Sequence, residues 1–155
     1  MSNESTTLEA ARQRIGEELG LSDWVTIDQA KLDAHARITG DEDWLHNDPE
    51  RAGRESPFGK TIAQGSLLIS MLVGFVTQIA PLADDVAYGL NYGFGRVRFI
   101  RPVPVDSRVR GRMVLKDIRL KGDHRYLVTI DATIEQEGAD QPRVAAEWLA
   151  LVVWA

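Results

Sequence analysis

The chain has 155 residues, 44% of them hydrophobic, which suffices for one domain with its own core. It contains no cysteine, so disulfides, thiolate zinc sites and cysteine nucleophiles are excluded. Eighteen basic and 23 acidic residues give a net charge of −5, which argues against a nucleic-acid binder. The net charge leaves open a local patch of basic residues that binds one small phosphorylated ligand.

No segment resembles a membrane span or a targeting signal. The most apolar stretch, residues 67–76, is shorter than the roughly 20 residues that a spanning helix needs. Residues 1–7 are polar and lack the pattern of a signal peptide. Together with the lack of cysteine, this predicts a soluble cytoplasmic protein that does not contact a membrane.

The N-terminal part of the chain is predicted to be mainly helical. Residues 8–19 carry apolar side chains at helical spacing, and Gly20 is expected to end that helix. Residues 24–27 form a short β-prone run. Asp28 is then a candidate N-cap for a helix over residues 29–37.

A polar connection and a very apolar helix are expected next. Residues 39–59 are rich in glycine, proline and charge, which predicts a loop with room only for a short helix at residues 49–54. Residues 62–79 are small or apolar all round, and Pro81 follows them. We expect a central helix there that is buried on most sides.

The rest of the chain is predicted to form strands. They cover residues 87–94, 96–100, 107–120, 125–135 and 144–153. Short segments at 122–123 and 137–140 predict hairpins between long antiparallel strands. Around Met113 every second residue is an arginine, which indicates one polar and one buried face. The pattern predicts an α+β domain in which an antiparallel sheet wraps a single helix.

The loop before the apolar helix is where catalytic side chains are expected, because loops on a rigid scaffold often carry function. His46 can act as a general acid or base near neutral pH. Asp41, five residues earlier, can lie beside it across a turn and orient the ring or handle a second proton. Two simpler interpretations remain: a solvated surface histidine, and a turn residue after Gly40. Asp48 is interpreted only as a helix N-cap.

A metal centre in this loop is not favoured. Leu45 and His46 occupy the positions where a calcium loop needs an acidic or amide side chain and a glycine. A catalytic zinc would need two more imidazoles, and His35 and His124 have no clustered spacing. No metal and no cofactor are therefore expected.

Gly65 is the second candidate feature, at the start of the apolar helix. Free backbone N–H groups at a helix N-terminus can hold a developing oxyanion, and a glycine lets a ligand approach them. The alternative is that Gly65 only permits close helix–strand packing. Ser66 and Ser70 lack the surroundings of a hydrolase nucleophile and are interpreted as small packing residues.

Two further patterns in the strand region are weaker indications of a binding site. The glycines of residues 89–95 do not have dinucleotide-binding spacing. Six arginines on the predicted strands are most simply solvent-facing, although one or two of them contacting a phosphate is an open alternative. They are Arg96, Arg98, Arg101, Arg108, Arg110 and Arg112.

A series of short motifs between residues 38 and 72 is shared with one known family. The motifs are Thr39-Gly40-Asp41, Leu45-His46, Asp48-Pro49-Glu50-Arg51-Ala52, Pro57-Phe58-Gly59, Thr61-Ile62-Ala63 and Gly65. They resemble the MaoC-like, (R)-specific enoyl-CoA hydratases, which have a hot-dog fold. The hydratase motif of that family, Asp followed five residues later by His, is matched by Asp41 and His46. Asp43-Trp44 and Asn91-Tyr92-Gly93 are similar to the NodN-like subgroup.

The resemblance implies a single hot-dog domain over residues 1–155. It further implies a helical extension at 1–20 and an overhanging active-site loop at 39–65. Proteins of this kind usually form homodimers and act on acyl-CoA or acyl-carrier thioesters.

The resemblance also implies roles for individual residues. Asp41 and His46 would activate the water that adds to a trans-2-enoyl thioester, and the Gly65 N–H would polarise the carbonyl. Gln64 replaces the family's usual histidine, so it can orient a group but cannot titrate. Two alternatives stay open: an acyl-CoA thioesterase and a non-catalytic acyl-CoA-binding protein.

Overall fold

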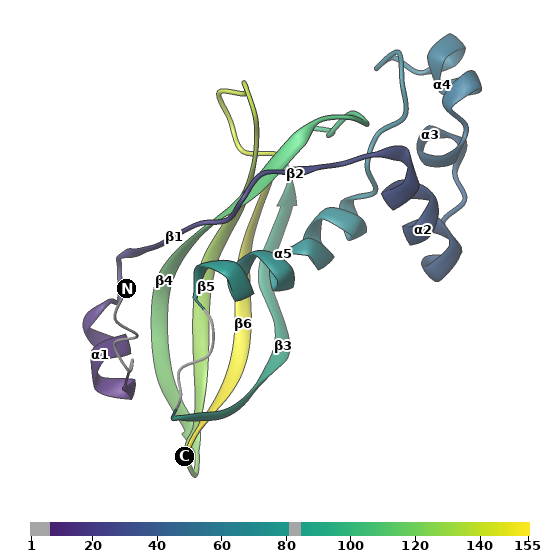
Figure 1. The fold of residues 1–155 in the computed structure, drawn as a ribbon. Helices are drawn as coiled ribbons and strands as arrows, with labels where there is room; N and C mark the ends of the chain where they lie inside the picture. The colour runs from purple at the N-terminus through teal and green to yellow at the C-terminus, as the bar shows by residue number, and fades with distance from the viewer. Residues whose placement is uncertain (1–6, 81–84) are drawn as a thin grey trace.

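A curved antiparallel sheet wraps around one helix in the computed structural model, which describes residues 7–80 and 85–155 (Figure 1). The sheet is six-stranded, with the order β1-β4-β5-β6-β3 and with β2 also paired to β4. The strands are β1 (Glu18–Leu21), β2 (Val25–Thr26), β3 (Val86–Phe99), β4 (Arg108–Gly122), β5 (Arg125–Gln136) and β6 (Val144–Trp154). The helices are α1 (Leu8–Gln13), α2 (Gln29–Thr39), α3 (Trp44–Asn47), α4 (Pro49–Glu55) and α5 (Gly65–Ile79). The α+β architecture predicted from the sequence is confirmed.

Strands β4, β5 and β6 form the centre of the sheet, and they are long and antiparallel, as predicted. In β4, Val109 and Met113 are fully buried, whereas Arg108 on the opposite face is exposed. The sheet therefore has one face toward α5 and one outer face that carries charge. Gly111 of β4 lies so close to α5 that an added Cβ would meet Cβ of Phe75 at 2.8 Å.

The central helix differs from the prediction at its start. It begins at Gly65 and not at residue 62, because the preceding residues are extended and pair with a distant segment. Ile62 forms an isolated antiparallel bridge with Pro104, and the Ala63 N–H donates to the Val103 carbonyl at 2.8 Å. Pro81, expected to follow the helix, lies outside the described residues.

The helix is also less enclosed than predicted. Leu68 and Leu72 face the core, but the side opposite the sheet is open to solvent in the single chain, and Val73 is 46% exposed. The exposed residues of α5 are Ser66, Ser70, Val73, Gly74, Thr77 and Gln78. The expectation of burial on most sides is therefore wrong for one copy of the chain.

The N-terminal segment corrects a second prediction. Helix α1 ends at Gln13, and residues 18–19, expected to be helical, belong to strand β1, which pairs with β4. Gly16, with φ of 91°, ends the helical path between them. Pairing with β4 thus overrides the helical spacing of the apolar residues. Residues 1–6 of the expected 1–20 helical extension lie outside the described residues.

Strand β3 replaces the two strands predicted at 87–94 and 96–100. It is one strand paired to β6 throughout, with register shifts that include one between Phe94 and Arg96. It is an edge strand of the sheet, and several of its large apolar side chains are exposed. They are Tyr88, Leu90, Tyr92 and Phe99.

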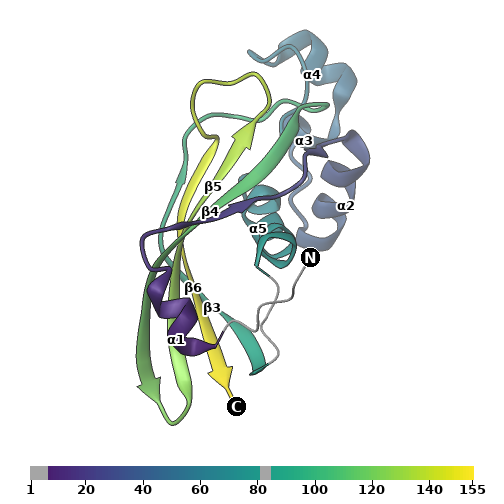
Figure 2. The ribbon, with the colours of Figure 1, turned by 60° about the vertical axis from the view of Figure 1, so that its left-hand side comes forward.

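Helices α2, α3 and α4 gather at the N-terminal end of α5 (Figures 1 and 2). The predicted α2 and α4 are present, each N-capped by the expected aspartate, Asp28 and Asp48. Helix α3, a single turn, was not predicted, and it carries His46. Over residues 7–80 and 85–155, no helix has the length and apolar character needed to cross a membrane.

Candidate active site

The ring of His46, a residue of α3, is held in place by a hydrogen bond. Its Nδ1 lies 2.7 Å from the carbonyl oxygen of Ile62. A carbonyl oxygen only accepts hydrogen bonds, so Nδ1 carries the proton in this contact. Nε2 then has a free lone pair in the neutral ring. The ring is oriented by the backbone just before α5, and its second nitrogen is available as a base.

A polar network fixes the backbone of His46 from the other side. Gln29 of α2 donates through Nε2 to the His46 carbonyl at 2.7 Å and to Oδ1 of Asp33 at 2.9 Å. Its Oε1 accepts from the fully buried Thr61 hydroxyl at 2.6 Å. Asn47 donates to the same Asp33 oxygen at 2.9 Å. Gln29 thus links α2, α3 and the segment before α5.

Asp41 lies in the turn after α2. Gly40, with φ of 76°, ends the helix, and the Asp41 N–H donates to the Thr39 hydroxyl at 3.3 Å. The Asp41 side chain is exposed, and its carboxylate forms no hydrogen bond with any described residue, His46 included. Joint action of Asp41 and His46 therefore remains a prediction.

The N-terminus of α5 has free backbone donors next to Gly65. The first hydrogen bond of the helix runs from the Leu68 N–H to the Gln64 carbonyl at 3.2 Å. The N–H groups of Gly65, Ser66 and Leu67 precede that bond. They form the part of the helix that can receive a developing negative charge, since the helix dipole is positive there. The N–H of Gly65 lies at the start of α5, and its role in binding a carbonyl stays a prediction.

Gly65 also permits close packing. A Cβ built on it would lie 2.9 Å from Cε1 of Phe99, the last residue of β3. The close packing in the alternative interpretation is therefore present, and packing alone does not decide between that interpretation and a role in binding.

Gln64 connects α5 to α2. Its side chain is 1% exposed, and Nε2 donates to the Leu32 carbonyl at 3.1 Å. Its Oε1 has no hydrogen-bond partner among the described residues. These contacts support an orienting function.

One contact at this end of α5 was missed by sequence reasoning. Nε2 of His35, on α2, lies 2.8 Å from the hydroxyl oxygen of Ser66. Ser66 is exposed, so its interpretation as a core packing residue is wrong. The two residues are 31 positions apart, and no local pattern could have paired them. In the described part of the chain, no three His, Asp or Glu side chains are grouped to hold a metal ion.

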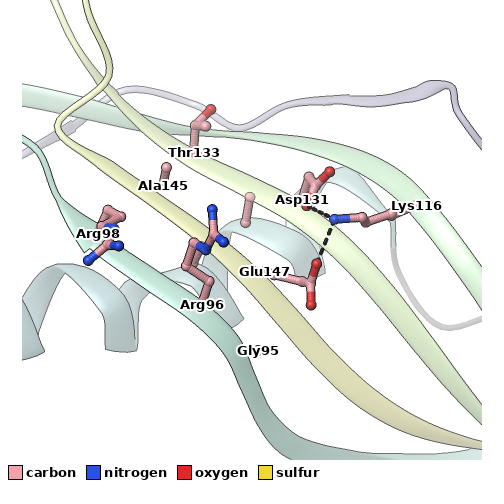
Figure 3. A pocket seen from close by; sticks show the side chains of 10 residues that line it. Gly95, Arg96, Arg98, Lys116, Asp131, Thr133, Ala145 and Glu147 are labelled. Atoms are coloured by element: carbon pink, nitrogen blue, oxygen red, sulfur yellow. Dashed lines mark hydrogen bonds and ion pairs between the residues drawn. The ribbon is translucent and has the colours of Figure 1, made fainter.

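A separate depression of about 580 Å³ lies on the outer face of the sheet (Figure 3). It contains none of the predicted site residues. Lys116 donates there to Glu147 at 2.5 Å and to Asp131 at 3.3 Å. These bonds raise the pKa of Lys116, and the bond from Lys116 lowers the pKa of Glu147. Arg96 and Arg98 form the side of the depression nearest the sheet edge.

A family model and similar known sequences point to the same family. Residues 10–137 match the model of the MaoC like domain family. Nodulation protein N of Rhizobium leguminosarum bv. viciae is 43% identical over 139 residues, covering 90% of this chain and 86% of the relative. The 3-hydroxyacyl-thioester dehydratase Z of Mycobacterium tuberculosis is 42% identical over 132 residues, covering 85% and 86% of the two chains.

Solved structures agree on the fold. A monoamine oxidase regulatory protein from Archaeoglobus superposes with a TM-score of 0.76 at 26% identity, covering 91% of each chain. The (R)-hydratase from A. caviae superposes with a TM-score of 0.71 at 23% identity, covering 88% of this chain and 94% of the other. The hot-dog fold expected from the motifs is thereby confirmed. On its sequence and its fold, this chain belongs to the MaoC-like family, within the group similar to nodulation protein N.

Proposed function

We propose that the protein is a hydratase of trans-2-enoyl thioesters that forms (3R)-hydroxyacyl thioesters, and that it also catalyses the reverse dehydration. The observation that carries the proposal is the bond from His46 Nδ1 to the Ile62 carbonyl, which leaves Nε2 free as a base. The 42% identity to a protein named 3-hydroxyacyl-thioester dehydratase supports it.

The proposed reaction adds one water across the carbon–carbon double bond. His46 Nε2 takes a proton from the water as its oxygen attacks Cβ, and the electrons shift to the thioester oxygen. The Gly65 N–H stabilises that enolate oxygen. The proton then passes to Cα, with Asp41 sharing the transfer with His46. Gln64 orients the loop, and the reaction needs no cofactor.

A homodimer in the cytoplasm is part of the proposal. Large apolar side chains are exposed along the edge strand β3, and Val73 is exposed on α5. A second copy of the chain would cover them, and exposed apolar surface of this kind typically marks an interface.

The test compares the wild type with His46→Ala and Asp41→Asn in the hydration of crotonyl-CoA. We expect kcat to fall by about 100- to 10,000-fold for His46→Ala, the range of general acid–base catalysis, and by a smaller factor for Asp41→Asn. The control is His124→Asn, at the turn between β4 and β5, where asparagine tolerates φ of 53°. Equal activity in all four proteins would contradict the roles assigned to His46 and Asp41.

Thioester hydrolysis is the second candidate, favoured by the contact between His35 and Ser66. A hydroxyl bonded to an imidazole can act as a nucleophile, and the free N–H groups of α5 lie beside it. Release of free thiol without hydration, lost in Ser66→Ala, would identify this activity. Tight binding of acyl-CoA without turnover of any thioester would instead identify a non-catalytic binding protein.

A further inference from the structure

We propose that the Ser66 hydroxyl donates a hydrogen bond to the thioester oxygen, beside the Gly65 N–H, and that His35 positions this hydroxyl by donating to its oxygen. Ser66 then contacts the reacting group, and His35 is a positioning residue that acts through it. The inference deepens the proposed function and rests on it, because both need an acyl thioester at the start of α5. The hydroxyl stabilises the charge on the enolate oxygen and keeps its own proton.

The first support is the place of Ser66 in the helix. It lies in the first turn of α5, one residue after Gly65, and it is exposed. The Cα–Cβ bond of a helical residue tilts toward the N-terminus of the helix, so this side chain leans toward the end where the free N–H groups emerge. A hydroxyl group rotates to suit its acceptor. An oxygen atom bound to the Gly65 N–H therefore has the Ser66 hydroxyl as its neighbour.

The second support is a buried bond that holds the two helices together at this point. Nε2 of Gln64, a side chain only 1% exposed, donates to the Leu32 carbonyl at 3.1 Å. Leu32 lies about one turn before His35 in α2. The bond therefore fixes α2 against the start of α5, and the 2.8 Å contact between Nε2 of His35 and Oγ of Ser66 is formed before any ligand arrives.

The direction of that contact follows from the other nitrogen of the His35 ring. A neutral imidazole carries one proton, and the partner of one nitrogen decides which of the two holds it. In His46, the Ile62 carbonyl keeps the proton on Nδ1. No group in the described part of the chain is hydrogen-bonded to Nδ1 of His35. We therefore assign the His35 proton to Nε2, which donates to the Ser66 oxygen.

This direction separates hydration from hydrolysis at one pair of residues. A serine hydroxyl has a single hydrogen to donate. When its oxygen accepts from His35, that hydrogen is left for the ligand, and the two bonds in sequence strengthen the donor. A nucleophilic Ser66 would instead donate to His35, and the ring would be oriented by a third group. The described residues supply no such group at Nδ1, so the pair suits a hydrogen-bond donor better than a nucleophile.

The first experiment measures hydration of crotonyl-CoA by Ser66→Ala and Ser66→Thr. We expect kcat to fall about 10- to 100-fold in Ser66→Ala with KM little changed, because the bond is strongest to the charged enolate oxygen. Ser66→Thr keeps the hydroxyl and should recover most of the loss. The matched control is Ser70→Ala, one turn further along α5, whose hydroxyl donates to the Leu67 carbonyl at 2.7 Å. It should match the wild type.

Two results for Ser66→Ala would overturn the assigned contact. A wild-type kcat would mean that the hydroxyl does not touch the reacting oxygen. A rise in KM with an unchanged kcat would mean that it binds the ground state and the transition state equally.

A pair of variants tests His35. His35→Leu removes the donor to Ser66 and should lower kcat about five- to tenfold. His35→Gln places an amide N–H near the position of Nε2 and should recover most of that loss. An amide cannot take the proton that a nucleophilic serine has to lose. Thiol release by the wild type that is lost equally in Ser66→Ala, His35→Leu and His35→Gln would overturn the inference in favour of hydrolysis.

The protonation of the ring is a readout that does not depend on activity. Long-range proton–nitrogen NMR spectra distinguish the two neutral forms of a histidine labelled with nitrogen-15, and His35→Gln identifies the signals of His35. At about pH 8, where an ordinary imidazole is neutral, we expect the proton on Nε2 in His35 and on Nδ1 in His46. A proton on Nδ1 of His35 would overturn the inference.

Failure of this inference and failure of the proposed function can be told apart. If the wild type does not hydrate crotonyl-CoA, the proposed function fails. Calorimetric titration with acetoacetyl-CoA, whose enolate form carries negative charge on the same oxygen, then decides the role of Ser66 by itself. The inference stands only if Ser66→Ala weakens that binding and Ser70→Ala does not.

Discussion

Gly65 lies directly under the ring of Phe99, and three ring carbons would come within 3.1 Å of a Cβ at that position. Real Cβ atoms are not found that close to a neighbour without movement of one of them. The end of β3 and the start of α5 can therefore approach one another only because residue 65 has no side chain. The same approach keeps the free N–H groups of α5 next to the end of the sheet edge.

Gly65→Ala should therefore destabilise the protein by about 1–3 kcal/mol, the usual range for overpacking. Urea unfolding of the variant and the wild type measures the difference. The double variant Gly65→Ala/Phe99→Ala removes the ring and should recover most of the loss. Failure of the double variant to recover would show that the glycine matters for another reason.

Gln29→Leu should weaken both the fold and the candidate reaction. The substitution removes the bonds to His46, Asp33 and Thr61, and leaves the buried Thr61 hydroxyl without its acceptor. We expect a loss of about 2–3 kcal/mol in the free energy of unfolding. We also expect a lower kcat at a similar KM, because the position of His46 is no longer fixed.

The matched control for this variant is Gln78→Leu, on the exposed side of α5. Its side chain accepts one hydrogen bond, from the Asp23 N–H at 3.0 Å. It should lose less stability and keep its kcat. A Gln29→Leu enzyme with the wild-type kcat would contradict the role of the network in positioning His46.

Glu135 should make stability depend on pH in the acid range. Burial alone would raise the pKa of Glu135, but hydrogen bonds from Arg112 and Arg110 outweigh it and hold the pKa below 4.5. The folded state then binds this proton less tightly than the unfolded state. The contribution is complete above about pH 4.5 and is lost as the pH falls through the folded pKa.

Unfolding of Glu135→Gln and the wild type at a series of pH values checks this. The variant should be less stable by about 0.5–1 kcal/mol at pH 7, with the gap closing toward pH 3. Glu50→Gln, in a pair with Arg54 that is open to solvent, serves as the control and should change little at either pH. A gap that widens on acidification would contradict the assignment.

The exposed strand β3 gives a prediction about assembly. Leu90→Asp places a charge among the exposed apolar side chains of the edge strand, where Leu90 is 53% exposed. If that edge forms the dimer interface, the variant should sediment as a monomer and the wild type as a dimer. Leu120→Asp, at a site 63% exposed on β4, is the control and should not change the mass. A dimeric Leu90→Asp protein would place the interface elsewhere.

Most of the long elements could be predicted from the sequence, whereas the one-turn helix α3 and strand β1 could not. Strands β4, β5 and β6 each run for more than ten residues with clear alternation, so pattern alone defines them. Helix α3 has four residues, too few for any periodicity to emerge. Strand β1 carries helical spacing, and only its pairing with β4 makes it extended.

In the candidate site too, local sequence patterns identified some residues and missed those that depend on distant contacts. His46 and Gly65 were identified because their residue types suit the chemistry and they lie in a recognisable series of motifs. Gln29 was not, because its partner Thr61 is 32 residues away and no local pattern connects them. The arginines of the outer depression were interpreted as solvent-facing strand residues, with a phosphate contact by one or two of them left open, since the sequence does not say which of them lack carboxylate partners.

The extended segment before α5 has a consequence for how the protein can be divided. The candidate hydratase residues Asp41, His46 and Gly65 lie within the first 65 positions, yet Ala63 and Thr61 bond to Val103 and Val105 from the other half of the chain. A fragment that stops after α5 would contain Asp41, His46 and Gly65 without the connection between β3 and β4 that holds the segment before α5. We expect such a fragment to be inactive until the C-terminal half is supplied as a separate chain, so the catalytic loop is not a module that could be transferred alone.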